Sequence, residues 1–238
     1  MTVVATLVEV TLRGLLSRRR TVLLVLLAAL PVVLALLARL GGGADAAPVL
    51  DALVVRTVLP LTALVLGTAA IGSELEDGTA VYLLVKPIGR LEIVVAKVAV
   101  SAVLTSALAG ASALLTGLVL GGGARDLDAT LAITPAVIVG GVVYSAAFVT
   151  VSVFTTRALV VGLVYTIIWE GILAGILAGT KVFSIREAVL GIAGGLAPGA
   201  IDGGLEPVQA VALSAIVIVG GTLLAARRLA VQEVRGGD

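Results

Sequence analysis

Long hydrophobic stretches without a charge dominate this chain. A membrane-spanning helix needs about 20 mostly apolar residues. Uncharged stretches cover 21–38, 57–73, 98–124, 129–156 and 207–226, and a further one, 158–180, is interrupted only by Glu170. The pattern predicts an all-α, polytopic membrane helix bundle of six transmembrane helices, at residues 21–40, 54–73, 97–121, 130–155, 158–179 and 207–227.

The composition agrees with this interpretation. Hydrophobic residues make up 60% of the chain, charged residues only 13%, and the mean hydropathy is +1.22. Soluble globular proteins carry about 25% charged residues. Residues 18–238 are therefore expected to form one transmembrane domain, without a soluble domain large enough to act alone.

The first seventeen residues have a pattern of their own. Apolar side chains recur at helical spacing, with polar ones elsewhere on the helical wheel; the apolar set is Val4, Leu7, Val8, Leu12, Leu15 and Leu16. Residues 1–17 are predicted to form an amphipathic helix in the membrane surface, held near anionic head groups by Arg18–Arg20. The alternative is an extension of the first span.

A second short apolar segment precedes the last span. Residues 188–201 are apolar but too few to cross a bilayer, and they contain four glycines and a proline. A run of this length is typical of a re-entrant or interfacial segment. We therefore expect residues 183–205 to form a re-entrant segment on the outer side.

Basic residues in the connections predict the orientation, because Lys and Arg are enriched in cytoplasmic loops. With both termini inside, eleven of the sixteen basic residues are cytoplasmic: Arg13, Arg18, Arg19, Arg20, Lys86, Arg90, Lys97, Arg157, Arg227, Arg228 and Arg235. Five are outside: Arg39, Arg56, Arg125, Lys181 and Arg186. Only three of the sixteen are lysines, which is typical of a GC-rich bacterial genome. Both termini are predicted on the cytoplasmic side of a bacterial plasma membrane.

Residue types that are missing exclude several classes of chemistry. The chain has no histidine and no cysteine, so these residues supply no triad, thiol nucleophile, disulfide or metal ligand. No G-x-x-x-x-G-K-[ST] phosphate loop is present, so the chain is not an ATPase of that type. A net charge of +1 and 3% aromatic residues offer no nucleic-acid surface. We expect neither an enzyme nor a cofactor bound by this chain.

The loop at residues 73–90 carries the most specific pattern. Three acids, Glu74, Glu76 and Asp77, stand at the cytoplasmic end of the second span and are followed by Gly78. Thr79 is placed to cap a short amphipathic helix that ends before the proline at position 87. A short amphipathic helix of this kind fits a groove on another protein.

The same loop resembles a known family. E-x-E-D-G-T (74–79), then L-L, then K-P-x-x-R (86–90), looks like the first cytoplasmic loop of ATP-binding-cassette (ABC) export permeases of the second type. The resemblance implies a coupling helix that docks on a separate ATPase subunit, present in two copies, which binds ATP and magnesium. It also implies a second permease subunit, identical or related. In outline it covers the whole chain, and in detail 72–90 and Trp169-Glu170.

The resemblance assigns roles to individual loop residues. Glu74, Glu76 and Asp77 would face the ATPase groove and its basic rim, although a solvated acidic turn is the plainer interpretation. Gly78 and Thr79 would set the turn that directs the coupling helix. Lys86, Pro87 and Arg90 would fix the return to the membrane, and for the two basic residues positive-inside anchoring is a comparable explanation.

Glu170 is the one charge near the middle of a predicted span. A charge near mid-bilayer costs roughly 2.5–3.5 kcal/mol on the milder insertion scales, so Glu170 is expected to face the bundle interior. With Trp169 it would form either a polar point on a substrate path or an interhelical contact that only holds the fold. The sequence does not identify its partner.

The hypothesis that fits best is the permease subunit of an ATP-driven exporter. Its apolar, aromatic-poor helices suit a hydrophobic substrate such as a drug, a lipid or a peptide. An ion-gradient-driven transporter is the main alternative, although such proteins usually show internal repeats and several intramembrane charges. A membrane-embedded enzyme and a membrane scaffold are further alternatives.

Overall fold

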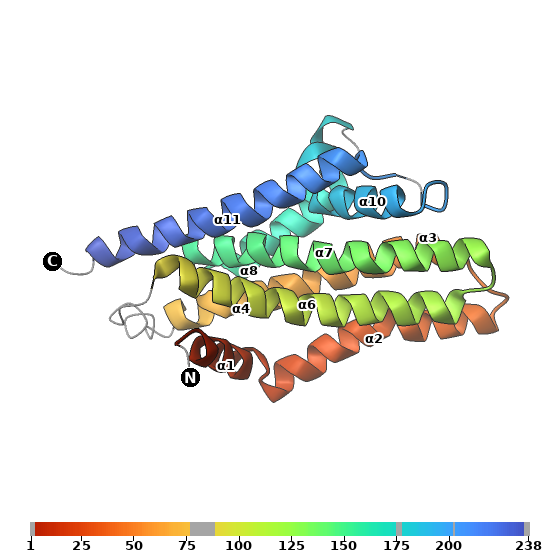
Figure 1. Ribbon diagram of the computed structural model, residues 1–238. Coiled ribbons are helices and arrows are strands. Elements are labelled where there is room, and N and C mark those ends of the chain that lie inside the picture. Colours follow the sequence, from red (N-terminus) through yellow and green to blue (C-terminus); the bar gives the residue numbers. More distant parts are fainter. Residues whose placement is uncertain (1–2, 77–88, 175–177, 202, 236–238) are drawn as a thin grey trace.

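The chain folds into a bundle of long helices that lie side by side (Figure 1). The computed structural model describes residues 3–76, 89–174, 178–201 and 203–235. In these residues the regular structure is helical, apart from one isolated bridge between Pro198 and Ile201. The predicted all-α membrane helix bundle is confirmed. Five helices are long and apolar enough to cross a membrane: 18–40, 46–71, 90–120, 124–154 and 207–231.

The first helices lie at one side of the bundle. Helix α1 (Val3–Leu15) ends before Ser17, and α2 (Arg18–Leu40) begins after it in a different direction (Figure 1). Helix α1 therefore does not simply extend α2. Its Leu15 is buried, whereas Glu9 and Arg13 form an exposed ion pair. The helix has one packed side and one open side, as an amphipathic helix should.

The second long helix begins earlier than the sequence predicts, at residue 46. Helix α3 (Ala46–Val49), π-helix η1 (Leu50–Val58) and α4 (Leu59–Glu76) follow one another without a break. The wider π turns come directly before Pro60. A proline cannot donate the α-helical hydrogen bond, and its ring would clash with the carbonyl four residues earlier, so a local π segment accommodates it.

Helices α6 (Arg90–Leu120) and α7 (Ala124–Phe154) form the centre of the bundle. Small residues let their backbones approach: a Cβ on Gly117 would lie 2.2 Å from Thr130 Oγ1. The Ser101 hydroxyl donates to Ser145 Oγ across the pair, at 3.2 Å. Small residues and interhelical hydroxyl bonds are the usual means of helix association in membranes.

The last part of the chain contains a shorter apolar helical segment. Helix α8 (Ala158–Val164) continues as π-helix η2 (Tyr165–Leu173), and residues 175–177 lie outside the described residues, so the predicted end at 179 stays a prediction. The chain then forms a 3-10 helix, η3 (Ala178–Phe183), and returns to the bundle as α10 (Ile185–Leu196). Helix α11 (Pro207–Arg235) completes the fold.

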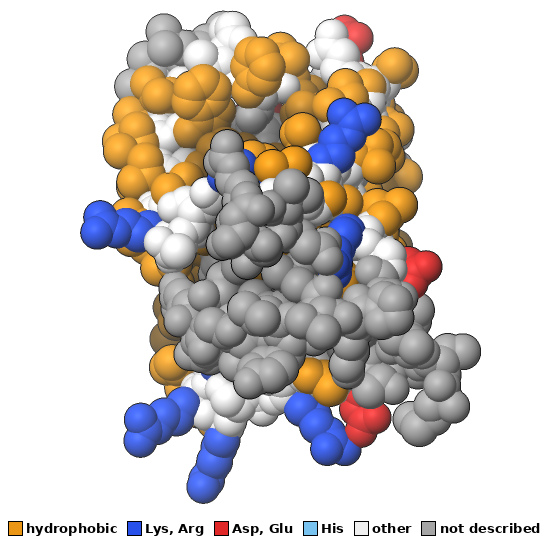
Figure 2. Space-filling model, turned by 90° about the vertical axis from the view of Figure 1, so that its left-hand side faces the viewer, with side chains coloured by type: hydrophobic (Ala, Val, Ile, Leu, Met, Phe, Trp, Pro, Cys, Tyr) orange, Lys and Arg blue, Asp and Glu red, His pale blue; other side chains and the backbone are white. Residues whose placement is uncertain are grey.

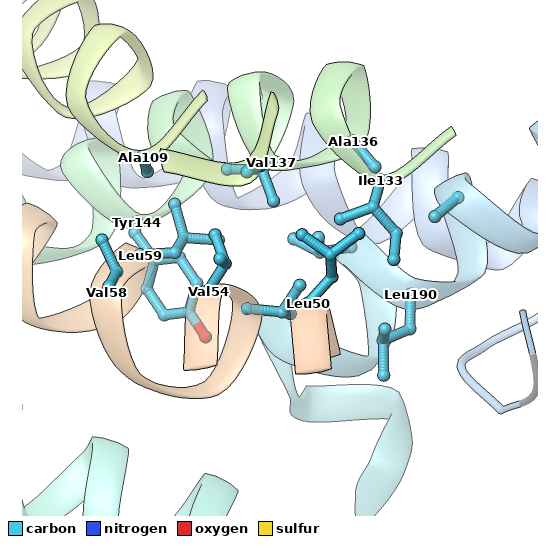
Figure 3. Packing of buried hydrophobic residues seen from close by; sticks show 14 of the residues in the cluster. Leu50, Val54, Val58, Leu59, Ala109, Ile133, Ala136, Val137, Tyr144 and Leu190 are labelled. Atoms are coloured by element: carbon cyan, nitrogen blue, oxygen red, sulfur yellow. The ribbon is translucent and has the colours of Figure 1, made fainter. Parts of the chain in front are cut away.

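Helix α10 is a core element even though it is short. It packs against α7 and α11, within the segment expected to be re-entrant (Figure 1). Its Leu190 joins Leu50, Val54 and Ile133 in the main buried cluster (Figure 3). Helices η1, α7 and α10 therefore share one hydrophobic core, and the outer part of the bundle depends on α10.

The two ends of the bundle differ in charge. The loop end is defined as the end where α4 stops at residue 76 and α6 starts at residue 90, with the amino terminus and the last turns of α11 nearby (Figure 1). Lys and Arg side chains point outward around this face (Figure 2). The opposite end, called the far end, holds the connections 41–45, 121–123 and 197–206.

Candidate functional site

Glu170 lies in η2, with its side chain only 3% exposed. In a π-helix the hydrogen bonds connect residues five apart, so side chains at positions i and i+5 come to lie over one another. The hydroxyl of Tyr165, five residues earlier, donates to Glu170 Oε1 at 3.1 Å. Segments of π-helix are rare and are frequently found at functional sites.

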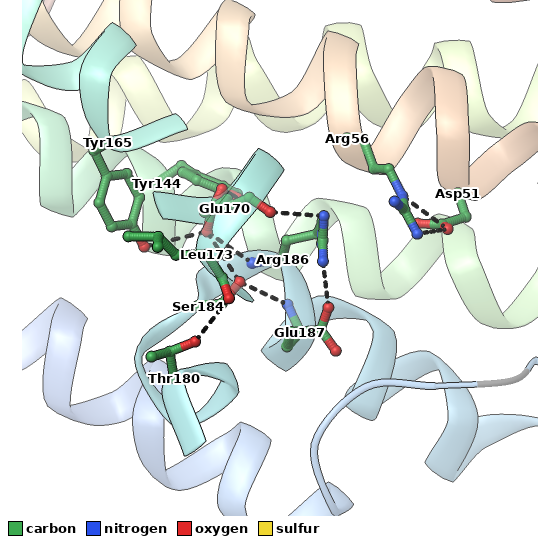
Figure 4. Close-up of polar contacts among 10 residues, drawn as sticks. All are labelled: Asp51, Arg56, Tyr144, Tyr165, Glu170, Leu173, Thr180, Ser184, Arg186 and Glu187. Carbon is green, nitrogen blue, oxygen red and sulfur yellow. Dashed lines mark hydrogen bonds and ion pairs between the residues drawn. The ribbon is translucent and has the colours of Figure 1, made fainter. Parts of the chain in front are cut away.

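The Glu170 carboxyl group collects donors from three segments (Figure 4). Tyr144 of α7 donates its hydroxyl to Oε2, and the backbone N–H of Arg186 in α10 donates to Oε1 at 3.1 Å. The Ser184 hydroxyl donates to the same oxygen at 3.4 Å. Glu170 is the acceptor in each of these bonds. The partner that the sequence left open is thus a set of four donors.

A buried ion pair adjoins this carboxyl group. Arg186 donates from Nη1 to the main-chain oxygen of Glu170 at 2.8 Å and from Nη2 to Glu187 Oε1 at 2.5 Å. Arg186 and Glu187 are each 5% exposed. The guanidinium thus pairs with the Glu187 carboxylate and also holds the main chain at Glu170. A buried ion pair of this kind is strongly destabilised when one partner is removed.

The start of α10 supplies further positive potential. Ser184 is its N-cap, and the Ser184 hydroxyl accepts the N–H of Glu187. Because Glu170 accepts the Arg186 N–H, its carboxyl group faces the positive end of the helix dipole. The start of α10 thus holds the Glu170 carboxyl group through a backbone N–H, through the Ser184 side chain and through the helix dipole.

Another charged pair lies close by, on η1. Arg56 donates from Nε and Nη2 to Asp51 Oδ2, at 3.0 and 2.7 Å. These two residues are again five apart on a π-helix, so the same geometry aligns them. Figure 4 shows this pair beside the Arg186–Glu187 pair.

The cluster lies where the segment α8–η2 meets the start of α10. The carbonyl of Leu173 accepts the Thr180 hydroxyl at 3.1 Å, and α10 begins at Ile185 after its N-cap, Ser184. Glu170 therefore connects the end of one helical segment to the start of the next. In membrane transporters, discontinuous helices whose ends face polar groups often form the substrate or ion site.

An apolar groove adjoins the cluster. It has a volume of about 690 Å³ and lies between α7, α8, η2, η3 and α11. The ring of Tyr165 lines the groove, while the Tyr165 hydroxyl belongs to the Glu170 cluster. The two features share this residue.

The structure separates the other predicted site residues into two groups. Trp169 is half-buried beside Glu170, but among the described residues it makes no hydrogen bond to the cluster. Glu74 and Glu76 belong to the last turn of α4, and Arg90 is the first residue of α6. Five further loop residues lie outside the described residues: Asp77, Gly78, Thr79, Lys86 and Pro87.

Lys97, counted among the cytoplasmic loop residues, is placed inside the bundle. It is 2% exposed, and its Nζ donates to the carbonyl of Ala70 at 2.6 Å. Ala70 belongs to the last turns of α4, where a cation stabilises the negative end of the helix dipole. Lys97 therefore ties α6 to α4 just behind the loop.

Sequence reasoning missed the four Glu170 partners, namely Tyr144, Tyr165, Ser184 and Arg186, and the neighbouring Glu187. One signal was available: Arg186 and Glu187 are adjacent charges in front of an apolar run. The two tyrosines gave no comparable signal, because only the fold brings them to Glu170.

A comparison with protein families agrees with the topology and the loop pattern. Residues 12–198 match the model of the ABC-2 family transporter protein. The chain belongs to this family. A search of curated proteins found no match. As an ABC-2 family member, the chain is an ABC permease subunit and a multi-pass membrane protein, and the family implies association with an ABC ATPase subunit. The resemblance stated from the loop is thereby confirmed.

Proposed function

We propose that this ABC-2 family chain is the permease subunit of an ATP-driven exporter for a hydrophobic substrate such as a drug, a lipid or a peptide. The family match over residues 12–198 is the observation that carries the proposal. Two permease subunits, identical or related, would enclose the path, and two ATPase subunits would bind ATP and magnesium beneath them. This chain would change access to a site without making or breaking a covalent bond.

The charge distribution supports an orientation with the loop end in the cytoplasm of a bacterial cell. Two of the five basic residues predicted outside are engaged in ion pairs within helices: Arg56 with Asp51, and Arg186 with Glu187. The other three predicted outside are Arg39, Arg125 and Lys181. Leaving out the ion-paired Arg13 and the buried Lys97 in the same way keeps nine basic residues inside, so the positive-inside bias remains.

The end of α4 supports coupling to the ATPase through residues 73–90. Glu74 and Glu76 lie in the last turn of α4, and that turn carries no basic residue. An acid at a helix C-terminus is unfavourable by about 0.3–1 kcal/mol, because it faces the negative end of the dipole. Binding of these acids to a basic rim on the ATPase would offset this unfavourable interaction.

The junction between η2 and α10 is where a motion of the ATPase subunits, transmitted through the loop end, would change the substrate path. Segments α8–η2 and α10 are held together by the Glu170 donors and by the Arg186 guanidinium. A shift of α4 and α6 at the loop end would reach α8 through α7, which packs against all three helices. Separation of η2 from α10 would then expose polar groups to the path.

The buried charges also favour a second candidate, an ion-gradient-driven transporter, since such proteins use intramembrane acids. A transport assay separates the two. Inside-out vesicles containing this chain and the ATPase would be incubated with lipophilic fluorescent dyes, and dye uptake would be measured. The assay is run with and without ATP, and with and without ionophores that collapse ion gradients. The exporter proposal predicts dye uptake that needs ATP and persists with ionophores. Uptake that ionophores abolish and ATP does not support would overturn it.

A further inference from the structure

The groove beside Tyr165 has an almost entirely hydrocarbon lining. Among the described residues that line it, only Tyr165 and Gln209 have side chains with polar atoms. Val161, Phe183 and Ile216 contribute apolar side chains that are about half to two-thirds exposed. Since α11 is one of the helices long and apolar enough to cross a membrane, the medium in contact with this side of the bundle is lipid.

We propose that this groove holds an acyl chain of a bilayer phospholipid as a resident lipid, distinct from the transported cargo. Its volume is about 690 Å³. An acyl chain about 15 Å long, half the hydrocarbon core, and about 4.5 Å thick fills roughly 250 Å³. The groove therefore accommodates one such chain, or both chains of one lipid.

A helix of a partner protein does not fit the same space. A helix about 10 Å across fills roughly 400 Å³ per turn, so the groove would hold fewer than two turns. A helix that crosses the bilayer has more than five. The size of the groove thus favours a flexible hydrocarbon chain.

Tyr165 explains why the inner wall of the groove is apolar although the charged cluster lies behind it. Its hydroxyl contacts Glu170 Oε1 at 3.1 Å and the carbonyl oxygen of Phe183 at 3.2 Å. The polar atom is thus satisfied by protein, and the ring is presented to the groove. Because Phe183 also lines the groove, the acyl chain packs against both residues that join η2 to the segment before α10.

The sequence composition makes a direct test possible. The chain has a single tryptophan, Trp169, so a Trp169→Phe background gives a reporter at any chosen position. Ile216→Trp places the reporter in the groove, at a position 68% exposed. Val219→Trp is the matched control on the same helix: Val219 is 57% exposed and does not line the groove. Both variants would be reconstituted with phospholipid brominated on its acyl chains, which quenches tryptophan on contact.

The proposal predicts quenching of both reporters in the bilayer. After exchange into lipid-free detergent, Ile216→Trp stays quenched, and Val219→Trp recovers its fluorescence. Equal recovery of the two reporters would overturn the proposal, because the groove would then release lipid as fast as the open surface does. A groove reporter that bromine never quenches in the bilayer would overturn it too, by showing that protein covers the site.

A second measurement does not depend on a tryptophan in the groove. Native mass spectrometry of the detergent-purified wild-type chain should show a retained phospholipid. Ala212→Phe, which fills the groove, should reduce that species at least fivefold, and Ala215→Phe, on the same helix outside the groove, should not. An equal reduction, or none, in both variants would contradict the assignment. Neither measurement uses transport, so the outcome is independent of the exporter proposal.

Discussion

Replacing Glu170 by alanine should destabilise the bundle, and replacing it by glutamine should not. In the alanine variant, the Tyr144 hydroxyl and the Arg186 N–H lose their acceptor while still buried. Tyr165 keeps the Phe183 carbonyl as an acceptor. The Ser184 hydroxyl also loses Glu170, but its bond of 3.4 Å is too long to add a comparable loss. Two orphaned donors at about 2 kcal/mol each give a loss of about 4 kcal/mol.

Glutamine keeps one oxygen at the Oε1 position, where Tyr165 and Arg186 donate. The Tyr144 hydroxyl can rotate to accept from the new amide group. The charge-assisted part of these bonds is lost, about 1 kcal/mol per bond, but the desolvation cost of a buried charge is lost as well. The two effects oppose each other, so we expect Glu170→Gln to stay within about 1 kcal/mol of wild type.

Thermal unfolding of the purified chain in detergent, followed by the fluorescence of Trp169, measures both variants. For a chain of this size, 1 kcal/mol corresponds to about 2–4 °C in Tm. The alanine variant should melt about 8–16 °C below wild type, and the glutamine variant within about 4 °C. An alanine variant that melts with the wild type would refute the hydrogen-bond network. A glutamine variant as unstable as alanine would show that charge, and not hydrogen bonding, holds η2 and α10 together.

Three further predictions concern other contacts of the bundle. Arg186→Met should lower the free energy of unfolding by about 3–5 kcal/mol, because Glu187 is left buried and unpaired. Adding Glu187→Gln should restore most of this loss in the same melting assay, and no recovery would contradict the pairing. Asp51→Asn should cost less than about 1 kcal/mol because the Arg56 side chain of its ion pair is 50% exposed, and a larger drop in Tm would show that the pair matters more than its exposure implies. Gly117→Ala should lower the free energy of unfolding by about 1–3 kcal/mol, because its Cβ would clash with α7. The control Gly220→Ala, whose Cβ meets open space, should raise that free energy by up to about 1 kcal/mol. Equal melting temperatures of the two variants would argue against close α6–α7 packing.

Much of the architecture could be predicted from the sequence because a bilayer leaves few options. An uncharged run of about 20 residues has to satisfy its own backbone, and a helix does so locally. The runs at 98–124 and 129–156 accordingly became α6 and α7. The prediction was poorer where charges lie inside a helix. Because Asp51 and Arg56 are charged, the sequence predicts that the second span begins at 54, whereas the helical run begins at Ala46.

The candidate site was predictable only in part. The cost of a charge in an apolar span identified Glu170, and the structure buries it. Its donors come from positions 144, 165, 184 and 186, and hydropathy contains no information on which helix faces meet. The π register that places Tyr165 over Glu170 was equally hidden, because the same residues on an α-helix would point apart.

The most direct test of the account is ATP hydrolysis by the reconstituted complex of this chain with a co-expressed ABC ATPase subunit. The wild-type complex should co-elute and hydrolyse ATP, and Glu76→Ala with Asp77→Ala should reduce binding or turnover at least tenfold. The control, Glu9→Ala with Glu92→Ala, removes two acids outside residues 73–90 and should keep wild-type turnover. A stable chain that elutes alone, or two double variants that behave alike, would contradict coupling through this loop.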